Sequence, residues 1–137
     1  PSEKLNDTHN FISEYKNNFD AVLFGPPCFK FEIYEGEQQS INNFETYTKW
    51  LKGYWKSTLN MCAEVMKKSA KLGFVVRDYA DYFGYNYVLS QDLTKIAEDI
   101  FGKSKQYKIK LSQMKTKRSP KKLAMGNYES LFVYEKE

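Results

Sequence analysis

The sequence is poor in the residues that crosslink small proteins or bind metals in them. Its 137 residues include two cysteines, Cys28 and Cys62, and a single histidine. Two cysteines are too few for a disulfide framework, which indicates a reducing, cytoplasmic compartment. One histidine and two cysteines do not readily build a zinc site, so we expect no bound metal.

Long apolar runs are absent as well. No stretch approaches the roughly 18 consecutive apolar residues that a membrane-spanning helix needs. The first ten residues are polar and lack the apolar centre of a secretory signal. Together these absences predict a soluble, intracellular chain that does not contact a membrane.

Glycine is sparse, and no two glycines lie close enough to form the Gly-rich turn that cradles nucleotide-like cofactors. The glycines are Gly25, Gly36, Gly53, Gly73, Gly84, Gly102 and Gly126. The chain therefore contains no cofactor-binding turn of this kind.

Aromatic residues, in contrast, make up 17% of the chain, and apolar residues make up 42%. A disordered tail would be poor in aromatic residues, and no heptad or collagen-like period is sustained. The length predicts one domain. We assign it to residues 1–137 because no repeat or linker divides the chain.

Positive charge is concentrated in one segment near the C-terminus. The net charge is +4, and without this segment the chain would carry −1. A basic loop is a candidate contact for nucleic-acid phosphates, and the alternative is a solvated turn between two strands. The basic residues are Lys115, Lys117, Arg118, Lys121 and Lys122.

The hydrophobic pattern predicts alternating helices and strands. Expected helices cover residues 11–15, 46–68 and 91–101, and expected strands cover 20–24, 72–76, 107–114 and 130–134. Thr46 and Ser90 are the expected N-caps, and Gly102 suits a helix stop. Lys67 and Lys68 suit the last turn of the long helix, where the helix dipole favours positive charge.

These elements predict an α/β fold. A fully buried strand at 20–24, a long helix and a second buried strand form a crossover unit in a parallel sheet. The last two strands are expected to pair as an antiparallel hairpin. The sheet should therefore have about four strands, mostly parallel, with an antiparallel strand at one end.

The first strand ends at Gly25, Pro26 and Pro27, and this corner is the candidate site. In open α/β sheets, ligands bind beyond the carboxyl ends of the strands. Two prolines fix the backbone carbonyls without competing N–H groups, so the corner can accept hydrogen bonds from an amino group. A following aromatic residue can stack on a flat base. The alternative is a plain turn.

The corner and its surroundings resemble a family of S-adenosylmethionine-dependent DNA amino-methyltransferases that act on adenine or cytosine. The family carries a polar residue, two prolines and an aromatic residue after its fourth strand, and Gly25 to Cys28 stands at this position. Residues 31–34, 39–40 and 47–55 are similar to a phage and viral branch, and residues 128–134 are similar to the closing strand. The resemblance implies the C-terminal half of a partial Rossmann-like class I methyltransferase fold. It also places the last strand between the second and the third.

The resemblance also implies a mechanism and a set of site residues. DNA is the expected partner, and its target base is flipped into the site. The polar residue and the first proline carbonyl accept the amino hydrogens, and the aromatic ring stacks on the base. The implied catalytic residues are Gly25, Pro26, Pro27, Cys28 and Phe29, the substrate-binding residues are Phe31, Tyr34, Asp78 and Tyr79, and the phosphate contacts are the five basic residues named above.

Two positions depart from the family pattern. Gly25 replaces Asp, Asn or Ser, and Cys28 replaces the aromatic residue, although the adjacent Phe29 can substitute if the loop shifts by one residue. A catalytically silent scaffold or nucleic-acid-binding subunit therefore remains an alternative to the active enzyme. Methylation of RNA or of a protein amide remains a third, because the corner suits any planar amino group.

The family's Gly-rich cofactor turn follows its first strand, and the resemblance implies that the family's first three strands have no counterpart here. We therefore expect S-adenosylmethionine to be bound in the complete protein rather than by this chain alone. A preceding segment or a second chain would complete the sheet, unless the chain is a reduced relative that needs no cofactor. In each case the first strand should have one unpaired edge.

An aromatic cluster follows the second strand: Tyr79, Tyr82, Phe83, Tyr85 and Tyr87. It predicts either a surface for bases or partners or a packed loop. Arg77 and Asp78 directly precede it and form either a local ion pair or part of a cleft wall.

Overall fold

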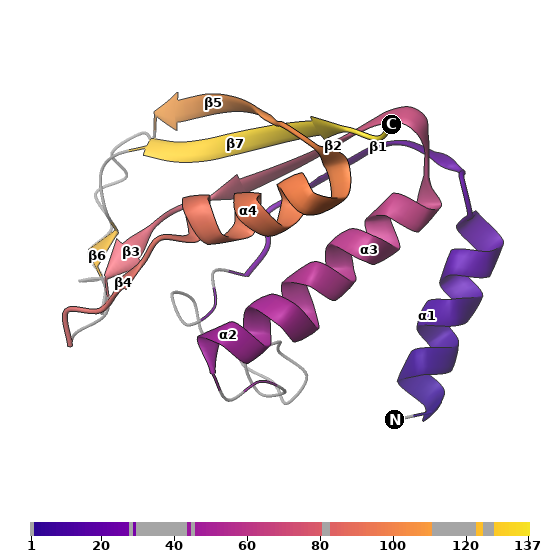
Figure 1. Ribbon diagram of the computed structural model, residues 1–137, viewed down its shortest axis with the longest axis horizontal. Coiled ribbons are helices and arrows are strands. Elements are labelled where there is room, and N and C mark those ends of the chain that lie inside the picture. The colour runs from indigo at the N-terminus through magenta and orange to yellow at the C-terminus, as the bar shows by residue number, and fades with distance from the viewer. Residues whose placement is uncertain are drawn as a thin grey trace, which may run out of the picture.

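The computed structural model describes residues 2–27, 29, 44, 46–80, 83–110, 123–124 and 128–137. Its helices are α1 (Ser2–Tyr15), α2 (Tyr47–Trp50), the π-helical turn η2 (Leu51–Trp55), α3 (Lys56–Val65) and α4 (Leu89–Phe101). Its strands are β1 (Phe19–Phe24), β2 (Met66–Val76), β3 (Tyr79–Ala80), β4 (Asn86–Tyr87), β5 (Lys105–Lys110), β6 (Leu123–Ala124) and β7 (Tyr128–Glu135) (Figure 1).

Four strands form the main sheet, in the order β1-β2-β7-β5. β1 and β2 are parallel, whereas β7 is antiparallel to both of its neighbours. Phe74 of β2 lies opposite Phe24 on one side and Phe132 on the other. This confirms the α/β fold, the position of the last strand and the β5–β7 hairpin pairing. β3, β4 and β6 form a second, small sheet that the sequence pattern did not predict.

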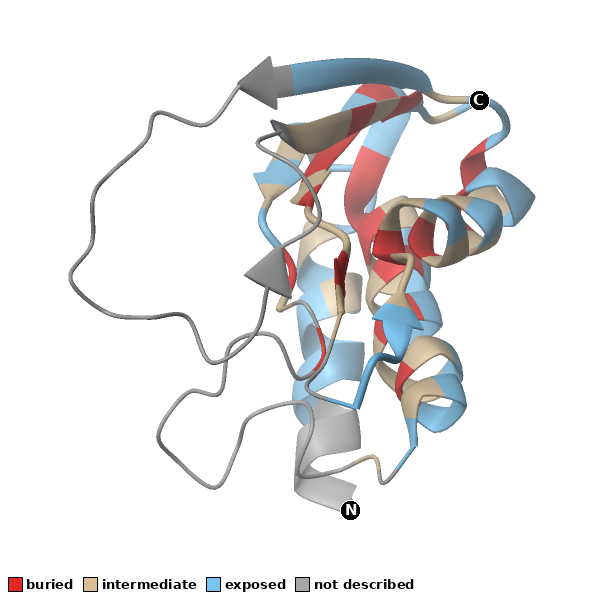
Figure 2. Cartoon of the chain, turned by 90° about the vertical axis from the view of Figure 1, so that its left-hand side faces the viewer, coloured by how far each residue is buried: buried red, intermediate tan, exposed pale blue. Residues whose placement is uncertain are grey.

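Helices α2, α3 and α4 cover one face of the main sheet (Figures 1 and 2). The core between the layers is built mainly from large rings and leucines, and Trp50, Trp55, Leu59, Phe74 and Leu93 are fully buried there. The indole Nε1 of Trp55 donates a hydrogen bond to the Leu93 carbonyl at 3.0 Å, which joins η2 to α4. The apolar stripe predicted for the long helix therefore does pack into the core.

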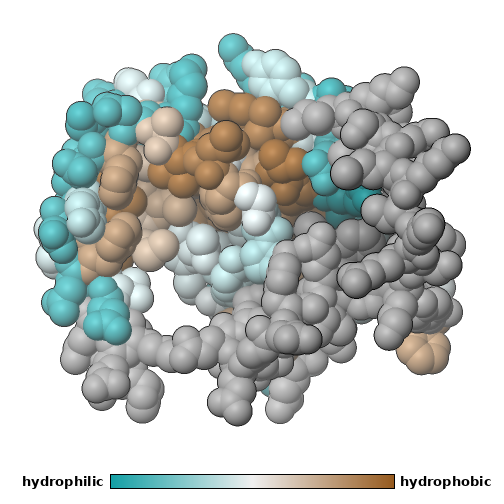
Figure 3. Space-filling model, turned by 180° about the vertical axis from the view of Figure 1, so that it is seen from behind, coloured by the Kyte–Doolittle hydropathy of each residue, from teal (hydrophilic) through white to brown (hydrophobic). Residues whose placement is uncertain are grey.

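The opposite face of the sheet is open over the described residues. Leu23 of β1 is 73% exposed, and Ala21 is exposed beside it, whereas Val22 and Phe24 pack against the core. Seen from behind, apolar side chains gather over the middle of the molecule (Figure 3). The prediction that the first strand is fully buried is therefore wrong. Alternate side chains of a strand point to opposite faces, and the described helices cover only one of them.

The long helix begins as predicted but ends early. The Thr46 hydroxyl accepts a hydrogen bond from the Lys49 backbone at 3.2 Å, which confirms the N-cap. Helix α3 ends at Val65, because Met66 turns extended and pairs with Phe19 of β1. Strand pairing thus overrides the helical periodicity.

Lys67 and Lys68 consequently lie in β2, and their predicted position in the last helical turn is wrong. Lys136 serves that end of the helix instead. Its ammonium group donates to the carbonyls of Ala63 and of Met66, the latter at 2.7 Å.

Helix α4 is capped by a residue that sequence spacing did not suggest. The helix begins at Leu89, so the prediction that Ser90 is its N-cap is wrong. The Asp78 carboxylate accepts hydrogen bonds from the Ser90 backbone N–H at 2.7 Å and from the Ser90 hydroxyl at 2.6 Å. The other end is as predicted, because Gly102 leaves the helix with a φ of 85°.

Strands β1 and β5 form the two edges of the main sheet. Among the described residues no strand pairs with the outer side of β1, as the sequence predicted. Residues 111–114, which were expected to continue β5, lie outside the described residues. The first helix spans residues 2–15 rather than 11–15 alone.

Candidate functional site

The candidate site lies at the carboxyl edge of the parallel pair β1 and β2. Gly25, Pro26 and Pro27 leave β1 at this edge, and Arg77 and Asp78 leave β2 there, because Phe24 and Phe74 are in register. Gly25 is exposed, Pro26 is buried and Pro27 is partly buried. Parallel pairing thus brings together two segments that are about fifty residues apart in the sequence.

Gly25 leaves room for a side chain. Its two chain neighbours apart, a Cβ atom built on it would meet no atom of the described residues within 4 Å, and its φ lies outside the left-handed region. The absence of a polar side chain at this position is therefore not required by packing.

Phe29 lies inside the protein rather than on its surface. The residue is 2% exposed and adopts a φ of 52°. Its ring centroid lies 5.4 Å from that of Tyr47, 5.5 Å from that of Trp50 and 5.8 Å from that of Tyr87. The ring therefore fixes the proline corner to the helical layer. To stack on a base it would have to leave this aromatic cluster.

The two predicted substrate-binding residues on the β2 side have structural contacts. Both carboxylate oxygens of Asp78 bind Ser90, so Asp78 is engaged with α4 rather than with Arg77. Tyr79 is fully buried and stacks on Tyr87 with ring centroids 4.8 Å apart. The Nε atom of Arg77 is buried and has no hydrogen-bond partner among the described residues.

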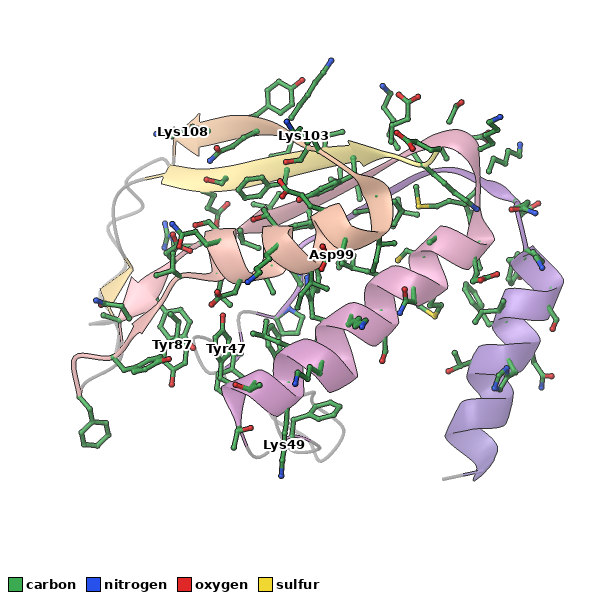
Figure 4. The ribbon with its side chains drawn as sticks, viewed as in Figure 1. Tyr47, Lys49, Tyr87, Asp99, Lys103 and Lys108 are labelled. Carbon is green, nitrogen blue, oxygen red and sulfur yellow. The ribbon has the colours of Figure 1, made fainter. Side chains whose placement is uncertain are left out.

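A hydrogen bond between Tyr47 and Asp92, which the sequence spacing did not indicate, joins two of the helices that pack beside the site. The Tyr47 hydroxyl donates a hydrogen bond to the Asp92 carboxylate at 2.7 Å and ties α2 to α4. Burial, and then this hydrogen bond, raise the pKa of Tyr47, so the phenol stays protonated and acts as a donor. The Tyr47 and Tyr87 rings lie next to each other, edge to face at 5.1 Å (Figure 4).

Exposed lysines lie along β5, the edge strand on the opposite side of the sheet from β1. Lys103, Lys105 and Lys108 are exposed on and just before β5, and Figure 4 shows Lys103 and Lys108 there. The remaining predicted site residues lie outside the described residues. They are Cys28, Phe31, Tyr34, Lys115, Lys117, Arg118, Lys121 and Lys122.

Neither a bilayer-spanning helix nor a cluster of metal ligands is found in the described part of the chain. No helix there is both long and apolar enough to cross a bilayer. No three or more His, Cys, Asp or Glu side chains there lie together as metal ligands would.

A scan against protein-family models and a search of curated proteins found no match. Similar solved structures include three of a proposed DNA modification methylase from Thermus thermophilus. Its selenomethionine derivative matches with a TM-score of 0.66 and 12% identity, over 94% of this chain and 50% of that one. Its complex with S-adenosyl-L-methionine matches with a TM-score of 0.63, 12% identity and the same coverage.

A third structure of that protein matches with a TM-score of 0.53 and 16% identity, over 95% of this chain and 51% of that one. The chain therefore shares the α/β fold of this methylase and spans about half of its length. At these identities the likeness shows the fold alone.

Proposed function

We propose that this chain forms the base-binding half of an S-adenosylmethionine-dependent methyltransferase that modifies the exocyclic amino group of adenine or cytosine in DNA. The observation that carries the proposal is the proline corner at the carboxyl edge of β1, in a fold shared with a proposed DNA modification methylase. In α/β sheets this edge is where ligands bind.

The corner would act by positioning. A flipped base would place its amino group against the Pro26 carbonyl, which has two lone pairs and can accept one amino hydrogen. Pro27 restricts the backbone of Pro26 and so fixes the direction of that carbonyl. Holding the amino hydrogens in the base plane directs the nitrogen lone pair out of that plane, toward a methyl donor. Catalysis of this kind depends on orientation and electrostatics rather than on a covalent enzyme intermediate.

The described residues do not form a cradle for the cofactor. S-adenosylmethionine would supply the methyl group, but the sequence has no Gly-rich turn, and prolines occupy the positions after Gly25, where backbone N–H donors would be needed. We therefore assign cofactor binding to a further polypeptide, in the same chain or in a partner, and derive no step through the cofactor.

The edge of β1 is the position we propose for that polypeptide. β5 carries Lys105, Lys108 and Lys110, and lysine on an edge strand discourages pairing. β1 carries no lysine, and its only charged residue, Asp20, forms an ion pair with Lys67 at 3.1 Å. A parallel strand added beside β1 would bring its crossover helix over the open face, because doubly wound sheets cover the second face in this way.

Hydrogen exchange tests this placement. The outward amides of β1 should exchange fast in the isolated 137-residue chain and slowly in the complete protein as its source produces it. Amides of β2, which pairs on both sides, serve as the internal control. Equal exchange of the β1 amides in both samples would place the further polypeptide elsewhere.

Transfer of a labelled methyl group to duplex DNA, RNA and protein tests the function in the complete protein. We expect labelling of DNA, a large loss with Pro26→Ala and a gain with Gly25→Asp, since the added carboxylate has room and can accept the second amino hydrogen. Lys95→Ala, on the exposed side of α4, is the matched control. Full activity of Pro26→Ala would refute the proposed role of the corner.

A second candidate function is a catalytically silent module that binds DNA. The burial of Phe29 favours it, because neither Phe29 nor Gly25 then offers a side chain to a base. This candidate predicts salt-dependent DNA binding through the basic segment. It also predicts no methyl transfer by the wild type and none by Gly25→Asp.

A further inference from the structure

The turn between β3 and β4 presents two aromatic rings to solvent. Phe83 is 97% exposed and Tyr85 is 56% exposed, whereas Tyr79 and Tyr87 on the flanking strands pack inward. Tyr82 lies outside the described residues, and the other four rings of the aromatic stretch are divided, with two packed inward and two on the surface. Such exposure of a phenylalanine is unusual, because transfer of its ring out of water is strongly favourable.

Residues 83–85 lead directly into β4, which is paired with β3. Tyr79 pairs with Tyr87 and Ala80 with Asn86, and β3 also pairs with β6 on its other side. Gly84 supplies the left-handed conformation of the turn, with a φ of 81°. The Tyr85 ring contacts Tyr87 edge to face at 4.6 Å. An aromatic ring fixed in this way loses little conformational freedom when it binds a ligand.

The turn also lies close to the proposed base-binding corner. Tyr87 contacts both Tyr85 and Phe29, with centroid distances of 4.6 Å and 5.8 Å. A single ring thus separates the exposed Tyr85 from the residue that anchors the proline corner. β3 itself follows β2 after two residues, so the turn projects from the carboxyl edge of the sheet (Figure 1).

We propose that Phe83 and Tyr85 form a stacking surface for unpaired nucleobases of the DNA strand. The proposal rests on the proposed function and names the side chains that would contact bases beside the target. Residues 83–85 carry no charged side chain, so we expect them to contact bases rather than to form ion pairs with phosphates. Base–aromatic stacking requires only an exposed π face.

Fluorescence anisotropy of two labelled strands separates base contacts from phosphate contacts. One strand is oligo(dT), and the other is an abasic strand of equal length with the same phosphates. Phe83→Ala and Tyr85→Ala should each weaken binding of oligo(dT) about tenfold and leave binding of the abasic strand nearly unchanged. Phe83→Trp should retain binding, whereas Phe83→Leu should behave like Phe83→Ala, because leucine keeps the apolar bulk and lacks the ring.

Phe11→Ala, an exposed aromatic position on α1, is the matched control and should bind as the wild type does. Wild-type affinity of Phe83→Leu, or equal losses on both strands, would overturn the stacking proposal while leaving DNA binding intact. These measurements use the complete protein as its source produces it. If its wild type bound neither strand, the proposed DNA function would fail together with the stacking proposal.

Discussion

The two faces of the main sheet differ in how completely this chain covers them. On the helical face, Trp55 and Leu59 are fully buried, and a hydrogen bond joins the Trp55 indole to α4. On the other face, Leu23 is largely exposed although it belongs to the same apolar run as Val22 and Phe24. Equal hydrophobicity in the sequence therefore led to different environments, because only one face has a packed layer in the described part of the chain.

The described residues of this chain pack one face of the sheet but not the other. One face and its helices form a core that this chain completes by itself, with the aromatic cluster around Phe29 at its carboxyl edge. The open face and the β1 edge would gain their packing from further polypeptide. Four changes test this contrast.

A matched pair of leucine truncations should show the largest difference. Leu59→Ala should cost about 2–5 kcal/mol of unfolding free energy, since it leaves a cavity in the helical-face core. Leu23→Ala should change it by no more than about 0.5 kcal/mol, because the side chain is already in water. Urea unfolding of the isolated chain measures both values. A large cost at Leu23 would mean that the open face is packed within this chain.

A pair of glycine substitutions makes the same comparison with an added methyl group. At Gly53 the methyl would overlap the Phe44 ring, which packs on the core, so Gly53→Ala should cost about 1–2 kcal/mol. At Gly73 it would meet the Leu23 side chain at 3.1 Å, and that exposed side chain can move, so the change should stay within about 0.5 kcal/mol. Thermal unfolding ranks the two variants, and equal losses would contradict the contrast.

Because the Cys62 thiol is buried in the helical-face core, the free energy of unfolding should depend on pH in the alkaline range. Burial raises the pKa of Cys62 from 9.0 to about 11. Between about pH 9 and pH 11, Cys62 therefore keeps its proton in the native state, whereas it loses that proton in the unfolded chain. This contribution to stability is complete below about pH 9 and is lost as the pH rises toward 11, by on the order of 2 kcal/mol.

Urea unfolding across this pH range should show a steeper fall for the wild type than for Cys62→Ala, which lacks the thiol. Parallel curves for the two proteins would mean that Cys62 titrates as an exposed thiol does.

The smallest expected loss of unfolding free energy is at the start of α4, one of the helices on the covered face of the sheet. Asp78→Ala removes both hydrogen bonds to Ser90 at the start of α4 and should cost about 1 kcal/mol. Ser90→Ala removes only the hydroxyl contact and should cost less. Chemical unfolding measures both. Unchanged stability of Asp78→Ala, together with weaker DNA binding, would favour the substrate-binding role predicted from the sequence.

Much of the fold was predictable because it depends on local patterns. The apolar run before Gly25, the helical spacing from Thr46 and the stop at Gly102 each act within a few residues. The early end of α3 was not predictable, because it results from the pairing of Met66 with the distant Phe19. Of the candidate site, the proline corner and its position at the carboxyl edge followed from the sequence.

The sequence by itself determined the alternation of helices and strands, the proline corner and the lack of a Gly-rich turn. The tertiary structure decided what the side chains around the corner do. It buried Phe29 against Tyr47, directed Asp78 to Ser90, and exposed Phe83 while it packed Tyr79. The physical reason is that burial and hydrogen-bond partners depend on residues far away in the chain. A residue's type and spacing do not identify those residues.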